Sequence, residues 1–301
     1  MNSAGKIPVP FKGQTGKPAF KPSRVTLPGA SLFLLPGLAG FTVFFILPFC
    51  VSLGYAFFDK PSGGSFAGLG NFAGLFQNRA YILGLLNTLR FIALSVPLNM
   101  GLSLLLALMI RGQRRREWFV LVFLIPLVIP SGSTAFFWKS LLAYEGALNG
   151  WLDRLGIQNI NWLDSGLALP VMTGIFLWKN IGYNTVLFLA GLGNIPGEQY
   201  EAARMDGAAR RHILWAIILP GLAPVSITAF MMSVINSFKI FREVYLISTG
   251  YPHESVYTLQ HFMNNMFVSL NYPKLTTAAV MLVIFIALFT QVLLRLERKF
   301  A

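Results

Sequence analysis

The sequence predicts an all-α membrane protein with about six transmembrane helices, and three observations lead to this prediction. Of its 301 residues, 55% are hydrophobic and only 12% are charged, against about 25% charged residues in an ordinary soluble domain. The mean hydropathy is +0.62. The few charges lie between long apolar runs, as expected where a charge that faces lipid near the bilayer midplane is costly.

Six apolar segments are long enough to cross a bilayer, whose hydrocarbon core of about 30 Å needs about 20 helical residues. The predicted spans are residues 30–57, 84–110, 118–142, 168–192, 220–241 and 276–296. Several of them contain proline, for example Pro36, Pro48, Pro97, Pro126 and Pro130. Membrane helices tolerate proline where neighbouring helices bond the freed carbonyl groups, so we expect bent spans.

The distribution of Lys and Arg predicts that both ends of the chain lie in the cytoplasm. The N-terminal tail, the segments 111–117 and 193–219, and the C-terminus together carry 15 of these residues, whereas the alternate connections carry five. Inner loops of membrane proteins are enriched in Lys and Arg, so the first set is predicted to be cytoplasmic. The outer segments 143–167 and 242–275 are polar and aromatic.

The N-terminal residues 1–29 are predicted to form a cytoplasmic basic tail, followed by a transmembrane domain over residues 30–301. The apolar run after the tail is too long for a signal peptide and lacks a clear cleavage site, so we expect it to remain as an anchor. The single cysteine, Cys50, excludes an intrachain disulfide. The net charge of +13 does not indicate nucleic-acid binding, because the basic residues flank apolar segments instead of clustering on a folded, water-exposed face.

The segment 193–220 differs from the other two inner connections. A Pro-Gly turn at 196–197 is followed by Glu198 and Glu201, which suit the positive end of a helix dipole. Gly207 is expected to end this short helix, before a second helix leads into the fifth span. The pattern predicts an amphipathic helix held against the inner membrane face with a hinge after it, and such an element suits docking of a cytosolic partner.

This segment resembles the EAA loop of ABC importer permeases. The matching residues, in sequence and spacing, are Glu201-Ala202-Ala203, Gly207 and Ile217-Ile218-Leu219-Pro220. The longer string 195–208 is similar to the sugar-permease branch, the maltose-type subunits. Further motifs that agree with this branch are Leu69-Gly70-Asn71-Phe72, Asn87-Thr88 and Thr249-Gly250-Tyr251-Pro252. The resemblance therefore covers nearly the whole chain after residue 30.

The resemblance implies a type I-like ABC importer permease core in the bacterial plasma (inner) membrane. In that family the loop forms a coupling helix that binds a groove of a cytosolic ATPase dimer. ATP-driven closure of that dimer moves the membrane helices between inward-open and outward-open states. A second homologous permease subunit completes the pathway for the sugar, and an extracytoplasmic solute-binding protein delivers it. ATP and Mg²⁺ then belong to the ATPase, and this chain needs no cofactor.

The same resemblance implies docking roles within the coupling loop, residues 193–220. Glu201 is expected to pair with a basic group of the ATPase, the adjacent alanines to permit close approach, and Gly207 to supply a bend. The docking residues are predicted to be Glu198, Glu201, Ala202, Ala203, Asp206 and Gly207. The alternative is an ordinary capped surface helix between two spans.

Polar side chains within the fourth and fifth spans are candidates for a substrate path, since polar groups at membrane depth are costly. Aromatic rings, amides and hydroxyls suit sugars, and the resemblance implies that corresponding stretches line the sugar cavity of maltose-type permeases. The candidates are Lys179, Asn180, Tyr183, Ser233, Asn236 and Ser237. The alternative is that these side chains pack helix against helix. Arg90, Lys139 and Lys239 either reach towards water from helix ends or indicate an anionic sugar.

The sequence predicts a transporter subunit and not an enzyme. It contains no G-x-x-x-x-G-K-[ST] phosphate loop, and its three histidines show no metal-ligand spacing with carboxylates. An integral-membrane enzyme would need clustered His or acidic residues near one interface. A stand-alone secondary transporter or channel would need inverted repeats or coupling-ion carboxylates, and the predicted spans offer no convincing Asp or Glu. Within the family, another small polar solute such as a sugar phosphate ester is the alternative to an oligosaccharide.

Overall fold

The computed structural model describes residues 27–248 and 250–300, with side chains from residue 34 to residue 295. In this part of the chain every regular element is a helix or a helical turn, and the one β-type contact is an isolated antiparallel bridge between Phe58 and Phe66. The predicted all-α fold is therefore confirmed. The predicted basic tail lies outside the described residues except for 27–29, as does Thr249 of the matched motif.

The chain divides into two compact units, residues 1–50 and 51–301. The first unit contains α1 (Leu27–Phe41), a π-helical turn (Thr42–Ile46) and the beginning of α2 (Leu47–Tyr55). Residues Leu34–Tyr55 are long and apolar enough to cross a membrane, in agreement with the first predicted span. The π-helical turn ends two residues before Pro48, and it contains Phe44, whose carbonyl in a regular helix would clash with the proline ring four residues on.

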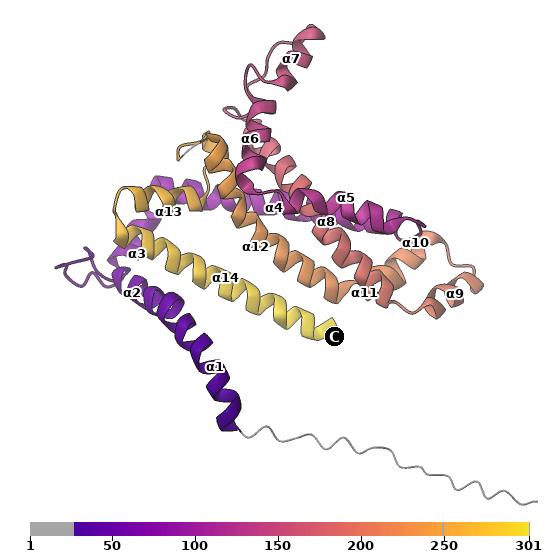
Figure 1. The fold of residues 1–301 in the computed structure, drawn as a ribbon, viewed down its shortest axis with the longest axis horizontal. Helices are drawn as coiled ribbons and strands as arrows, with labels where there is room; N and C mark the ends of the chain where they lie inside the picture. The colour runs from indigo at the N-terminus through magenta and orange to yellow at the C-terminus, as the bar shows by residue number, and fades with distance from the viewer. Residues whose placement is uncertain (1–26, 249, 301) are drawn as a thin grey trace, which may run out of the picture. The chain divides into compact units, whose positions relative to one another are not determined.

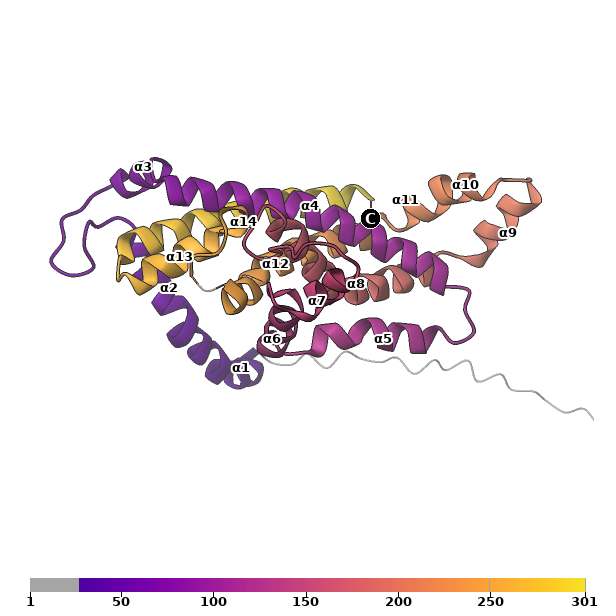
Figure 2. The same cartoon turned by 90° about the horizontal axis from the view of Figure 1, so that it is seen from above.

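The second unit is a bundle of long helices (Figures 1 and 2). Its long members are α4 (Arg79–Ile110), α5 (Arg116–Val128), α8 (Ala168–Asn194), α12 (Ala223–Ser248) and α14 (Tyr272–Phe300). α8 contacts α4, α5 and α12, and α14 contacts α12. The shorter elements are α3 (Gly70–Phe76), α6 (Ser131–Leu142), α7 (Ala147–Arg154), α9 (Gly197–Met205), α10 (Arg210–Ile213), a π-helical turn (Leu214–Ile218), α11 (Leu219–Gly221), a 3₁₀ turn (Glu254–Val256) and α13 (Leu259–Val268).

Four helical segments satisfy both the length and the hydropathy of a membrane span: Leu34–Tyr55, Arg79–Ile110, Ala223–Ser248 and Tyr272–Arg295. The bent pair α5 and α6 makes a fifth if it is counted as one span. The fourth predicted span forms α8, whose 27 residues extend about 40 Å at 1.5 Å per residue. α8 is not among the segments that pass this test, and it carries buried polar residues such as Thr173, Asn184 and Thr185. An interior helix faces other helices, so it can be more polar than one that faces lipid.

The third predicted span, residues 118–142, is wrong as a single helix. The chain turns by 92° between α5 and the helical segment that begins at Ser131. Ile129 has extended dihedral angles (φ −66°, ψ 126°), which the ring of Pro130 favours because it disfavours the helical region for the residue before it. α6 therefore starts a new direction and projects from the bundle with α7 (Figure 1).

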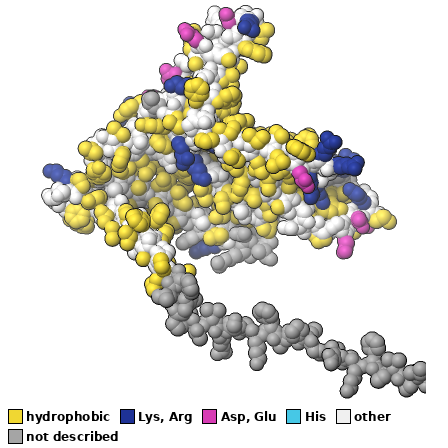
Figure 3. Space-filling view, viewed as in Figure 1, with side chains coloured by type: hydrophobic (Ala, Val, Ile, Leu, Met, Phe, Trp, Pro, Cys, Tyr) yellow, Lys and Arg dark blue, Asp and Glu magenta, His cyan; other side chains and the backbone are white. Residues whose placement is uncertain are grey.

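The segments predicted to be cytoplasmic and those predicted to be outside lie in different parts of the second unit. The turn between α4 and α5, together with α9 and α10, lies at one end of the bundle, and α3 and α13 lie at the other (Figures 1 and 2). Figure 3 shows hydrophobic side chains over the visible face of the long helices, with Lys and Arg gathered at the α9–α10 end. The exposed basic residues at this end are Arg114, Arg115, Arg116, Arg204, Arg210 and Arg211.

Candidate functional site

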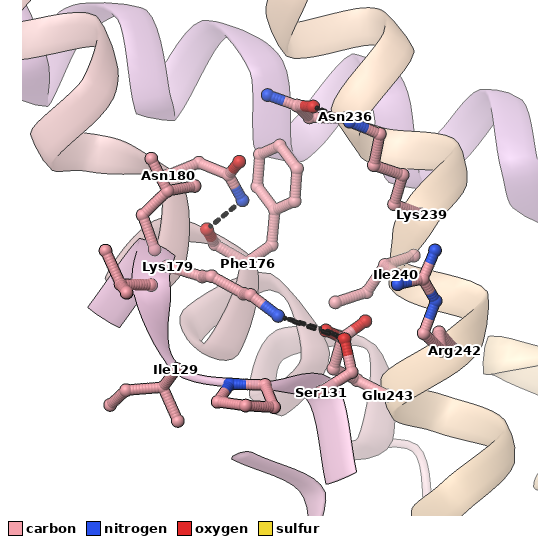
Figure 4. A pocket seen from close by; sticks show the side chains of 13 residues that line it. Ile129, Ser131, Phe176, Lys179, Asn180, Asn236, Lys239, Ile240, Arg242 and Glu243 are labelled. Atoms are coloured by element: carbon pink, nitrogen blue, oxygen red, sulfur yellow. Dashed lines mark hydrogen bonds and ion pairs between the residues drawn. The ribbon is translucent and has the colours of Figure 1, made fainter. Parts of the chain in front are cut away.

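A pocket of about 310 Å³ opens between α6, α8 and α12 (Figure 4). α8 contributes Phe176, Lys179 and Asn180, and the segment 127–131 forms a second wall. The α12 wall consists of Asn236, Lys239, Ile240, Arg242 and Glu243. The pocket exists because the break at Pro130 turns the chain away from α8 where a straight helix would have continued alongside it.

An ion pair joins the walls of this pocket. Lys179 Nζ lies 2.5 Å from Glu243 Oε1 and donates a further hydrogen bond of 3.2 Å to Ser131 Oγ. Ser131 Oγ in turn donates to Glu243 Oε1 at 2.8 Å. Glu243 is 3% exposed, and the pair is the only ion pair within the part of the chain that the structure describes. The carboxylate also lies at the start of α6, where the helix dipole favours negative charge. Three helices are thus tied together at one buried point.

Three of the six substrate-path candidates line the pocket. They are Lys179, Asn180 and Asn236. Asn180 Nδ2 donates to the Phe176 carbonyl at 2.8 Å, which leaves its Oδ1 available, and Asn236 Oδ1 accepts from Lys239 Nζ at 2.9 Å. A path through this pocket stays a prediction for these residues.

Tyr183, Ser233 and Ser237 are not among the residues that line the pocket. Ser233 is 1% exposed and accepts hydrogen bonds from Asn184 on α8 (2.6 Å) and from Asn99 on α4 (3.4 Å). Ser237 is 2% exposed and donates to the Val234 carbonyl at 2.6 Å. In this conformation Ser233 joins three helices, which is the packing alternative considered for these residues.

Sequence reasoning missed Glu243, Arg242 and Ser131. The fifth span was expected to end at residue 241, whereas α12 continues to Ser248 and places both residues 242 and 243 within the helix. The expectation that no span holds a convincing Asp or Glu is therefore wrong at Glu243. A signal existed, because Lys179 within a span requires a buried partner and Glu243 lies seven residues after Asn236, on the same face of α12.

The coupling loop forms α9, an exposed helix that starts after Pro196. Glu198, Glu201, Ala202 and Asp206 are exposed, as is Gly207, and Ala203 is partly buried. Gly207 has φ +73°, a left-handed conformation that glycine adopts without strain, and α9 ends there. The docking roles of these residues stay predictions.

Tyr200 connects α9 to the bundle. Its ring packs against a buried apolar cluster that includes Ala107, Leu192, Ile195 and Ile218. Its hydroxyl accepts a hydrogen bond of 2.7 Å from Arg111, the residue that follows α4. Sequence reasoning missed this contact because the two residues lie 89 positions apart. Tyr200 therefore anchors α9 to the bundle through both apolar packing and a hydrogen bond.

These features define a polytopic membrane protein with a pocket that carries charged side chains between its helices and with an exposed short helix, α9, at one end of the bundle. The chain belongs to the binding-protein-dependent transport system inner membrane component family, whose model matches residues 99–301. The resemblance to ABC importer permeases is therefore confirmed. Among the described side chains, no group of three or more His, Cys, Asp or Glu is placed to hold a metal ion.

The relatives of known name are transport permeases. The chain is 29% identical to the lactose transport system permease protein LacF of Rhizobium radiobacter, over 89% of this chain and 94% of that protein. It is 30% identical to the trehalose/maltose transport system permease protein MalF of Thermococcus litoralis, over 89% of this chain and 92% of that protein. The sn-glycerol-3-phosphate transport system permease protein UgpA of Agrobacterium fabrum is 29% identical to this chain, over 89% of this chain and 94% of that protein.

A solved structure has the same fold. The crystal structure of a bacterial ABC transporter involved in the import of the acidic polysaccharide alginate contains a chain with a TM-score of 0.78 and 22% sequence identity. The match covers 90% of this chain and 95% of that one. This chain therefore shares its fold with a chain of that transporter.

Proposed function

We propose that this chain is the membrane-spanning permease subunit of an ATP-driven ABC importer for a carbohydrate in the bacterial inner membrane. The observation that carries the proposal is the coupling loop, which matches the EAA pattern and folds as the exposed helix α9 at the basic end of the bundle. The family match over residues 99–301 and the named lactose and trehalose/maltose relatives support it.

In this proposal the chain works as one part of an assembly. α9 docks on a cytosolic ATPase dimer, which binds ATP and Mg²⁺, and this chain contributes no cofactor. A second homologous permease subunit forms the pathway with it, and an extracytoplasmic solute-binding protein delivers the sugar. Support for docking comes from the exposure of Glu198, Glu201 and Asp206 beside the partly buried Ala203, since a charged rim around a small-residue contact suits a protein groove.

A sugar phosphate ester is the second candidate substrate. Lys239 and Arg242 in the pocket wall favour it, and so does the similarity to the glycerol-3-phosphate permease. A stand-alone secondary transporter is disfavoured, because the family is binding-protein-dependent and because the carboxylate of Glu243 is already paired with Lys179.

The proposal is tested by ATP-dependent uptake of labelled oligosaccharides into vesicles that contain the chain and all candidate partner subunits. We expect the Glu201→Lys chain to insert into the membrane normally but to fail to retain the ATPase. Its uptake should fall at least tenfold. Glu117→Lys is the matched control, because it makes the same charge reversal at an exposed inner residue outside the coupling loop. Uptake by the chain alone, or normal uptake by Glu201→Lys, would refute the proposal.

A further inference from the structure

We infer that the pocket between α6, α8 and α12 binds the anionic group of an acidic carbohydrate, a carboxylate or a phosphate, through Lys239 and Arg242. This inference rests on the proposed function and names its substrate class. Its central observation is an imbalance of charge: three cations, Lys179, Lys239 and Arg242, line the pocket together with one carboxylate.

The single carboxylate is already satisfied. Glu243 Oε1 receives both the Lys179 ammonium and the Ser131 hydroxyl, so that pair is neutral as a unit. Lys239 donates to the neutral amide oxygen of Asn236, at 2.9 Å, and within the described residues neither Lys239 nor Arg242 has a carboxylate partner. The pocket therefore carries two cationic groups, Lys239 and Arg242, whose charge no carboxylate of the described residues compensates.

The spacing of these cations on α12 favours an added anion. Lys239 and Arg242 are three residues apart, and like charges at this spacing on a helix repel each other. Both side chains are exposed and reach the pocket wall. The planar guanidinium of Arg242 suits two-point hydrogen bonding to a carboxylate or phosphate. An anion held between the two side chains would remove their repulsion.

The remaining lining suits a sugar ring. The volume of about 310 Å³ lies at the lower end of the usual range for small-molecule pockets, about 300–1,000 Å³. The exposed side chains of Leu127 and Val128 supply apolar surface for the C–H face of a ring, and Asn180 and Asn236 supply amide groups for hydroxyls. The pocket thus joins an apolar wall, neutral hydrogen-bonding groups and a cationic edge.

The test compares uptake of a labelled galacturonate oligosaccharide with uptake of its carboxyl-reduced, neutral counterpart by the full assembly. Glucose 6-phosphate and glucose form a second pair, which distinguishes a phosphate from a carboxylate. We expect the native assembly to prefer the anionic member of at least one pair by tenfold or more. Lys239→Gln with Arg242→Gln should abolish that preference, so that the anionic and neutral members of the pair are taken up at equal rates.

Lys274→Gln with Arg154→Gln is the matched control, because it removes the same charge from exposed outer residues away from the pocket. Equal loss of preference in both double variants would overturn the inference in favour of a general surface effect. Uptake of neutral sugars that is ATP-dependent and unaffected by Lys239→Gln with Arg242→Gln, without preference for an anion, would overturn the inference and leave the proposed function intact. Absence of ATP-dependent uptake for all four probes would overturn both.

A lipid phosphate is a second source of the same chemistry. Repeating the native measurement in vesicles of zwitterionic lipid alone separates the two sources, because a solute site keeps its preference for the anionic sugar there. A preference that appears only when anionic lipid is left out would mean that lipid occupies the site, and would overturn assignment of the cations to the solute.

Discussion

The guanidinium of Arg111 lies over the ring of Tyr200, 4.4 Å from its centroid, and donates a hydrogen bond of 2.7 Å to the hydroxyl of the same side chain. Arg111 directly follows α4, which contacts α8, α12 and α13, whereas Tyr200 lies in the middle of α9. A displacement of α9 would therefore be transmitted through this contact to α4, the longest helix of the bundle.

Arg111→Ala should uncouple transport from ATP hydrolysis, because it removes both the stacking and the hydrogen bond. Each is worth about 1 kcal/mol or somewhat more at a half-buried site. We expect uptake per ATP hydrolysed to fall severalfold while the ATPase stays bound. Tyr200→Phe keeps the stacking and should lose less. Native stoichiometry in Arg111→Ala would show that α9 moves the bundle through other contacts.

Glu243→Gln should destabilise the bundle, because it leaves Lys179 without its charged partner. Removing one member of a buried ion pair costs about 3–5 kcal/mol, and we expect the lower value since the Lys179 side chain is 16% exposed. The combination Lys179→Met with Glu243→Gln should recover most of the loss. Thermal unfolding in detergent of the native chain, Lys179→Met, Glu243→Gln and the double variant measures the coupling between the two side chains. Additive losses would contradict the pairing.

Gly182→Ala should separate α5 from α8. A Cβ at position 182 would overlap the backbone carbonyl of Phe123, and backbone cannot move aside as a flexible side chain does. Overpacking of this kind costs about 3 kcal/mol. Gly174→Ala is the matched control, since the same helix has open space there. Similar melting temperatures for the two variants would show that α5 does not pack on α8 in the protein.

His261 should make the outer α13 region sensitive to acid. Burial lowers the pKa of this imidazole to about 4, from 6.5. The unfolded chain then binds more protons than the folded one between these two values, so stability is complete above pH 6.5 and is lost as the pH falls towards 4. At pH 5 the loss is about 2 kcal/mol.

His261→Gln should remove most of this pH dependence. The His261 ring accepts the backbone N–H of Thr258 and caps α13, and glutamine serves the same position of a capping box. The free energy of unfolding at pH 7.5 and at pH 5 would be compared for the native chain and the variant. An equal decrease in both would assign the acid sensitivity to other groups.

The sequence predicted the helical fold well because the signals are local and strong. Runs of about 20 apolar residues and the bias of Lys and Arg determine spans and sides without knowledge of any contact. The α5–α6 break was harder, since Pro97 lies within the continuous helix α4 while Pro130 ends a helix. The two prolines look alike in sequence, and only the packing around them decides between a bend and a turn.

The site was predicted in part, for a related reason. Lys179 was found because a lone cation in an apolar run stands out, whereas Glu243 was placed in a loop because charges normally end a span. The pair Arg111–Tyr200 and the bond from Asn184 to Ser233 join residues that lie far apart in the chain. No periodicity reports such contacts, so they become visible only in the folded chain.

The polarity of α8 has a consequence for the insertion of the protein into the membrane during synthesis. Lys179 leaves the ribosome 64 residues before Glu243, so its charge has no partner during the interval. α8 also does not pass the span test that α4, α12 and α14 pass. We expect α8 to settle stably in the bilayer only once α12 arrives, and chains truncated before residue 223 should leave α8 accessible to water-soluble labels. Stable membrane insertion of α8 would then depend on that of α12, so the two helices would insert cooperatively.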